Sequence, residues 1–96
     1  MRMMLKASLD TEKANDAARS GTLGKLIQES LEQIKPEAAY FTAENGKRTA
    51  LVFFDLKDPT DIPAISEPLF LNLGAELTYV PVMNPEEVEA GLGKIR

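Results

Sequence analysis

The sequence has 96 residues, a net charge of −4 and neither cysteine nor histidine, which fits one domain, 1–96, with a thin margin of stability. Without these residues the chain forms no disulfide and lacks the commonest metal ligand, general base and proximal haem ligand, so we expect no metal and no cofactor. The acidic balance argues against nucleic acid, and the longest apolar run, Ala50–Phe54, is too short to cross a membrane, so we expect a soluble cytoplasmic protein.

In the first third of the chain, the spacing of the apolar residues changes from strict alternation to a helical period. Alternating apolar side chains over Met3–Leu9 predict a strand with one wholly apolar face, and Lys6 lies on the other face. Apolar residues then recur with a helical period from Lys13 to Ile34, after a cap at Asp10 or Thr11. We therefore expect a strand followed by a long helix.

Two glycines interrupt this helical pattern. Gly21 and Gly24 each cost up to about 1 kcal/mol relative to alanine, so the helix is weakest between them. We favour one long helix that is loosened near 20–22 over a broken one. The string from Gly21 to Lys25 lacks the spacing and the preceding strand of a phosphate-binding loop, and Leu26 follows the lysine in place of Ser or Thr, so we expect no nucleotide here.

The strongest local signal is Asn45-Gly46, which lies between two segments rich in β-formers. A type I′ turn needs positive φ at both central positions, and this pair tolerates that conformation best. The turn fixes the register of two arms, 37–43 and 48–56. Tyr40 then opposes Leu51. Both faces of the second arm are apolar over 50–54, so we expect a strand that is covered on both sides.

A second helix follows the hairpin. The turn-forming cluster at 58–61 starts it, Pro63 fits its first turn, and Gly74 ends it after Leu73. Pro68 lies inside this helix and cannot donate a backbone hydrogen bond. We therefore expect a kink or a break at this proline.

The chain closes with a strand and a short helix. Alternation predicts the strand over 77–83, and Pro81 favours an edge position because proline cannot donate to a neighbouring strand. Asn84 is placed to cap a helix, with Pro85 at its first position and Glu87 at the capping-box position. The extension 84–96 has an apolar side made of Val88, Leu92 and Ile95. A helix this short is not stable alone, so we expect it to dock on something.

Strand, helix, hairpin, helix and strand is the ferredoxin-like βαββαβ plan, an α+β fold. Right-handed crossovers give a four-stranded antiparallel sheet of order 4-1-3-2 with the helices on one face. We expect the helix-covered face to bear Leu5, Ala7, Phe41, Ala50, Val52 and Phe54. We expect the open face to bear Met4, Lys6, Ser8, Tyr40, Thr42, Thr49, Leu51, Phe53, Asp55, Thr78 and Val80. Half of that open face is apolar, which favours a partner sheet or a ligand over solvent.

The element order, the half-apolar open face and the Pro-Val-Met-Asn-Pro-Glu-Glu segment at 81–87 resemble the dimeric α+β barrel superfamily, in particular small bacterial families of unknown function within it. The resemblance covers the whole chain, and its motifs are structural. It implies a homodimer in which two open sheet faces pack together, with a cleft between sheet and helices on each subunit. Related proteins include muconolactone isomerases, haem proteins like chlorite dismutase, quinol monooxygenases and ligand-sensing regulator domains. The haem proteins need a histidine that this chain lacks, and no monooxygenase triad matches it residue by residue.

Lys6 is the sharpest candidate for chemistry. A lysine enclosed at a dimer face loses hydration and can then serve as a base or as an anchor for an anion. The structural alternative is a salt bridge to Glu76 or Asp55 across the sheet, and we favour it because buried charges are usually partnered.

The other candidates for ligand binding are aromatic or polar side chains near the expected cleft. Tyr40 and Thr42 lie on one strand of the open face with Phe53 beside them, although a tyrosine at a sheet rim is ordinary packing. Tyr79 falls on the helix-covered face, and Glu67 adjoins the expected kink, where a solvated glutamate is the commoner reading.

Two functions follow from these patterns. The first is a homodimer, without catalysis, that binds a small apolar or aromatic molecule in the cleft. The alternative is a cofactor-independent enzyme, a monooxygenase or isomerase acting on a ring substrate, with Lys6 and Tyr40 as its polar groups. The two differ because an enzyme needs convergent polar groups in an enclosed pocket. A sensor domain is a third class, which the sequence favours less because it holds no helix-turn-helix segment.

Overall fold

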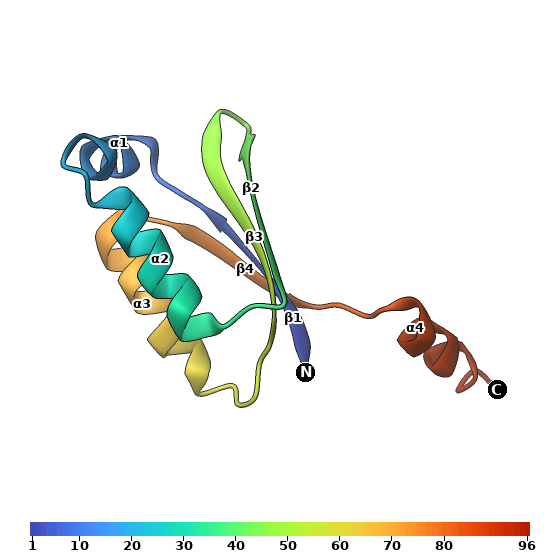
Figure 1. Cartoon of the computed structure of the whole chain (residues 1–96). Helices are drawn as coiled ribbons and strands as arrows, with labels where there is room; N and C mark the ends of the chain where they lie inside the picture. The colour runs from blue at the N-terminus through green and yellow to red at the C-terminus, as the bar shows by residue number, and fades with distance from the viewer.

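The computed structural model describes residues 1–96 and has the element order β-α-α-β-β-α-β-α (Figure 1). Its strands are β1 (Arg2–Ser8), β2 (Ala38–Glu44), β3 (Lys47–Asp55) and β4 (Glu76–Pro81). Its helices are α1 (Thr11–Arg19), α2 (Leu23–Ile34), α3 (Asp61–Leu73) and α4 (Pro85–Leu92). The four strands form one antiparallel sheet of order β2-β3-β1-β4, which confirms the α+β fold and the predicted strand order.

The hairpin has the predicted turn and register. Asn45 and Gly46 both have positive φ, 54° and 75°, as a type I′ turn requires. Tyr40 pairs with Leu51 across β2 and β3. On the other side, β1 lies between β3 and β4, so that Met4 is flanked by Phe53 and Val80. Pro81 ends the edge strand β4, where its missing donor costs no pairing within the sheet.

Three helices cover one face of the sheet and close the core. Asp10 caps α1 by accepting a hydrogen bond of 3.0 Å from the backbone N–H of Lys13. In Figure 1, α2 and α3 lie side by side on the same side of the strands. Buried apolar residues face this layer from β1, β3, α1 and α3: Leu5, Val52, Phe54, Ala14, Ala17, Leu69 and Leu73. The hydrophobic contact between helices and sheet is therefore concentrated under α1 and α3.

The expectation of one long helix over 13–34 is wrong. The chain forms α1 and α2 as separate helices, because Gly21 adopts a left-handed conformation with φ of 78° between them. The Ser20 hydroxyl donates to the Ala17 carbonyl over 3.1 Å, and the backbone N–H of Thr22 donates to the same carbonyl over 2.9 Å. These bonds satisfy the end of α1 and set the new direction of α2.

The helix α3 runs through Pro68 as one unbroken element, so of the expected kink or break the break does not occur. Pro63 lies in its first turn, where no intrahelical donor is needed. Gly74 ends the helix with φ of 54°, and its N–H donates back to the Phe70 carbonyl over 3.1 Å. The end of α3 is therefore the predicted one.

The last helix, α4, stands apart from the rest of the molecule (Figure 1). Asn84 and Glu87 form the predicted capping box at its start, with bonds of 2.8 and 2.9 Å. Its apolar side stays open, because Val88 and Leu92, with Ile95 just beyond the helix, are 41, 60 and 74% exposed. The expected docking of this helix does not occur within the chain. The molecule is correspondingly elongated, with extents of 55 × 28 × 18 Å.

Candidate functional site

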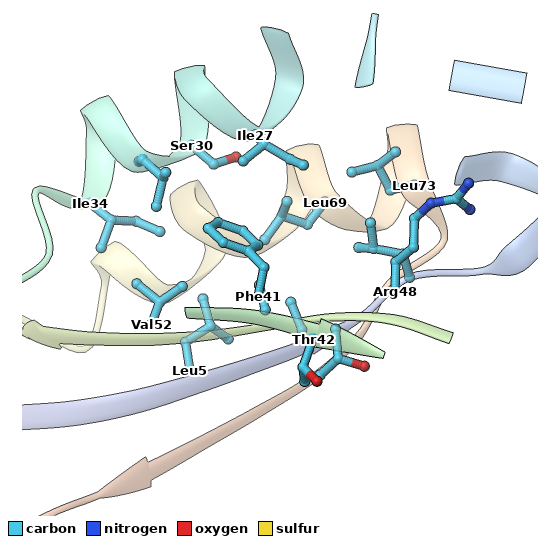
Figure 2. A pocket seen from close by; sticks show the side chains of 15 residues that line it. Leu5, Ile27, Ser30, Ile34, Phe41, Thr42, Arg48, Val52, Leu69 and Leu73 are labelled. Carbon is cyan, nitrogen blue, oxygen red and sulfur yellow. The ribbon is translucent and has the colours of Figure 1, made fainter. Parts of the chain in front are cut away.

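The main cavity lies between the helices α2 and α3 and the covered face of the sheet (Figure 2). Its volume is about 300 Å³, and 11 of its 15 lining residues are hydrophobic. The lining comes from β1 (Leu5, Ala7, Leu9), α2 (Ile27, Ser30, Leu31, Ile34), β2 (Phe41, Thr42), β3 (Arg48, Thr49, Ala50, Val52) and α3 (Leu69, Leu73). The cavity is therefore an apolar space between the two layers of the fold. The resemblance described above implies a cleft in this place, between the sheet and the helices.

The cavity exists because α2 does not pack closely on the sheet. This helix is amphipathic, yet none of its residues is buried. The floor below it includes the small side chains of Ala7 and Ala50, which leave space where larger residues would meet the helix. Phe41 points up from β2 toward α2 in Figure 2 and remains 54% exposed. The aromatic ring thus stands at the mouth of an incompletely filled layer.

Polar groups are few in this cavity. Ser30 lies on the helix side, and Arg48 lies at the end nearest α1 (Figure 2). The Arg48 guanidinium donates a hydrogen bond of 2.9 Å to the Asn15 side-chain oxygen, and no carboxylate forms a salt bridge with it. The lining also includes Thr42, whose hydroxyl points away from the helices in Figure 2. The site can offer apolar contact along its length and one cation at one end.

The open face of the sheet holds Lys6, but with a different partner from the one predicted. Lys6 forms a salt bridge with Glu44 on the edge strand β2, so the expected pairing with Glu76 or Asp55 is wrong. The physical reason is that Asp55 is already bonded to Lys57 over 2.7 Å, at the other end of the strand. Glu76 lines the same polar hollow as Lys6, at the hairpin end of this face, without bonding to it.

Of the other open-face candidates, Tyr40 and Phe53 lie outside the main cavity. Tyr40 is 64% exposed on β2, and its cross-strand partner is Leu51. Phe53 is half-buried beside Met4 in the centre of the sheet. Thr42 is the one candidate that contributes to the cavity lining. The structure therefore does not bring Lys6, Tyr40 and Phe53 together with the apolar cavity.

Tyr79 and Glu67 lie near α3 and are also separate from the cavity. Burial raises the pKa of the Tyr79 phenol, and the hydrogen bond of 2.7 Å to the Ser66 hydroxyl partly opposes that rise. This bond joins β4 to a buried residue of α3. Glu67 is exposed to solvent on the outer side of the same helix. Tyr79 thus has a structural partner.

Sequence reasoning placed Phe41 on the covered face but did not identify it as a site residue. It also missed Ile27, Ser30, Ile34 and Arg48 as lining residues. The helical period shows that Ile27 and Ile34 face the sheet, but periodicity does not distinguish a contact from a gap. The available signal for a gap was the small size of the sheet residues that face Ile27 and Ile34, such as Ala50.

The structure also bears on metal binding and on membrane insertion. No cluster of three or more acidic side chains is arranged to hold a metal ion. No helix has the length and apolar character required to span a bilayer. Comparisons with family models and with curated proteins found no match to this chain.

Proposed function

We propose that this chain is a binding module that takes a small apolar or aromatic molecule in the cavity between α2 and the sheet. The observation that carries the proposal is the cavity of about 300 Å³ with a largely hydrophobic lining. Ligand sites are typically concave, mostly apolar and furnished with a few polar groups that fix orientation. The volume suits a compact molecule of one or two rings, since it is at the small end of the usual range of about 300–1,000 Å³.

The charges around the cavity support a ligand with one acidic or polar end. Arg48 lies at the end near α1 without an acidic partner, and Asn15 holds its guanidinium in place. Guanidinium groups bind carboxylates well because their donors match the two oxygens. Phenolic acids combine an apolar ring with such a group and are therefore among the first compounds to test.

We also propose that the protein is a homodimer through its open sheet face, as in the dimeric α+β barrel superfamily that its sequence resembles. The sheet order and the ferredoxin-like plan are compatible with that superfamily. The support for dimerisation is an apolar row across all four strands, formed by Ala38, Phe53, Met4 and Val80. Covering this row would remove apolar surface from water, which is the main driving force for association.

The alternative function is a cofactor-independent monooxygenase or isomerase acting on a ring substrate. It requires Lys6 and Tyr40 to converge on that substrate. Lys6 is engaged with Glu44, and Tyr40 does not line the main cavity. The binding module is therefore the better-supported proposal.

The test is a thermal-shift screen of quinones, lactones and phenolic acids on the wild type and two matched variants. Phe41→Ala removes an exposed ring at the cavity mouth, and Tyr40→Ala removes its also exposed neighbour on the opposite face of β2. A compound that binds the cavity raises Tm in the wild type and in Tyr40→Ala, but much less in Phe41→Ala. Loss of the shift in Tyr40→Ala alone would favour the open face and the enzyme. No shift with any compound at saturating concentration would overturn ligand binding.

A further inference from the structure

We infer that residues 82–96, which we call the α4 arm, clasp a second copy of this chain. The inference rests on the proposed homodimer and adds to it a contact that the open sheet face alone does not supply. Each copy gives its arm to the other, so that the two contacts are related by the same two-fold axis.

The first observation is an apolar stripe with no partner. Met83 is 65% exposed at the start of the arm, Val88 and Leu92 remain open on one side of α4, and Ile95 is exposed just after the helix. An isolated helix of eight residues is not stable in water. The free energy lost in nucleating the helix exceeds the free energy gained from the hydrogen bonds of its two turns. Exposed apolar stripes on such a short element indicate a surface that is covered in the working assembly.

The second observation is that the root of the arm is fixed. The backbone N–H of Val82 donates to the Arg2 carbonyl over 3.1 Å. The Arg2 guanidinium then bonds both Glu37, over 2.9 Å, and Glu87 in the first turn of α4. The Glu87 carboxylate also accepts the Asn84 N–H in the capping box. These contacts set the direction in which the arm leaves the body.

The third observation is that direction itself. Figure 1 shows α4 on the opposite side of the sheet from α2 and α3, beyond the end where β4 finishes. The arm gives the molecule a radius of gyration of 15.3 Å, compared with about 12.5 Å for a compact domain of this length. It therefore projects into the space in front of the open face, which is where a second copy would lie.

The occupant is a second copy because the arm continues the surface proposed for dimerisation. The apolar row through Met4 and Val80 lies next to the root of the arm, since Met3 pairs with Pro81 at the end of β4. A stable interface of standard size buries roughly 800 Å² of accessible surface per partner. The exposed apolar side chains of an exchanged arm would add to the area that the small four-stranded face can bury.

The test compares two full-length variants that add the same charge to opposite sides of α4. Leu92→Glu places a carboxylate in the apolar stripe, and Ala90→Glu places one on the exposed polar side. Sedimentation measurements over a wide concentration range give the dimer Kd of each protein. We expect Leu92→Glu to raise the Kd at least about tenfold and Ala90→Glu to leave it nearly unchanged, because only the first carboxylate would be buried. Hydrogen exchange of the α4 amides provides a second readout, with protection that rises with wild-type concentration and is lost in Leu92→Glu.

The outcomes separate the clasp from the proposed dimer. A wild-type dimer whose Kd is the same in Leu92→Glu, with α4 amides unprotected at every concentration, would overturn the clasp and leave the sheet-face dimer intact. A wild type that stays monomeric up to near-millimolar concentration would overturn both. A cysteine-free chain also permits clean labelling, so Glu89→Cys with a fluorophore reports whether the arm changes environment on dimerisation.

Discussion

The side-chain amide of Gln33 donates a hydrogen bond of 3.1 Å to the backbone carbonyl of Ala64. This carbonyl is the one that Pro68, four residues further along α3, leaves without an intrahelical donor. A side chain from α2 thus supplies the bond that the proline removes from α3. The contact compensates the hydrogen bond that α3 loses at Pro68, and it ties together two helices that border the cavity.

Gln33→Ala should therefore lower the free energy of unfolding by about 1 kcal/mol, the usual net value of one hydrogen bond. Gln28→Ala is the matched control, because Gln28 bonds only the exposed Glu32 on its own helix. In a Pro68→Ala background the backbone N–H at position 68 can reach Ala64, so the cost of Gln33→Ala should shrink. Urea unfolding of the wild type, Gln33→Ala, Pro68→Ala and the double variant gives the coupling energy between the two positions. Purely additive effects of the two substitutions would contradict this account.

Gly46→Ala should destabilise the fold by about 1 kcal/mol through backbone strain alone, since an added Cβ meets no neighbour but φ is 75°. Gly24→Ala is the contrasting change, in α2, where φ is ordinary and the space is also open. We expect it to stabilise the protein by up to about 1 kcal/mol because alanine favours helix. Thermal unfolding of both variants tests the pair, and destabilisation of equal size at both positions would argue against the turn geometry.

Acid stability should depend on Asp55. The Lys57 ammonium, and then the N-terminal ammonium, bond to this carboxylate and lower its pKa from 3.8 to about 2. Because the folded pKa is depressed, the stabilisation is present above about pH 4 and is lost as pH falls toward about 2. The Tm difference between wild type and Asp55→Asn should therefore be constant near neutral pH and vanish in that window. The effect is small for an exposed group and should weaken with salt. A difference that grows on acidification would have the wrong sign.

Tyr79→Phe should lower stability by about 1–3 kcal/mol without changing ligand binding. The change leaves the buried Ser66 hydroxyl without its partner, and an unsatisfied buried donor costs more than the bond itself contributed. Adding Ser66→Ala should restore part of the loss, because both polar groups are then gone. Chemical unfolding and the compound screen together check this prediction, and loss of binding with stability unchanged would instead make Tyr79 a ligand contact.

The fold was predictable because strong local signals agreed. The Asn45-Gly46 turn fixed the hairpin register, and the capping residues Asn84 and Glu87 fixed the start of α4. The break between α1 and α2 was not predictable from the sequence. A glycine such as Gly21 is tolerated inside a helix at a cost in stability, and it is tolerated in a left-handed link at no cost. In the structure the left-handed link is accompanied by the bonds from Ser20 and Thr22 to the Ala17 carbonyl, which the helical period does not reveal.

The candidate site was less predictable for a related reason. A cavity is a shortfall in packing between α2 and the sheet, and residue types give no direct measure of such a shortfall. The partner of Lys6 was missed because Glu44 reaches it from the edge strand two strands away, a contact that depends on the twist of the hairpin. Whether Lys6, Tyr40 or Phe53 contacts a ligand stays a prediction.

The most direct test of the central claim, that the space under α2 is a binding site, is a chemical-shift titration of methyl-labelled protein. Anilinonaphthalene sulfonate is a suitable probe, because it carries aromatic rings and one anionic group. We predict saturable shifts centred on the methyls of Ile27, Ile34 and Val52, which line the cavity. Shifts confined to Met4 and Leu51 on the open face, or no saturable shift at any methyl, would contradict the claim.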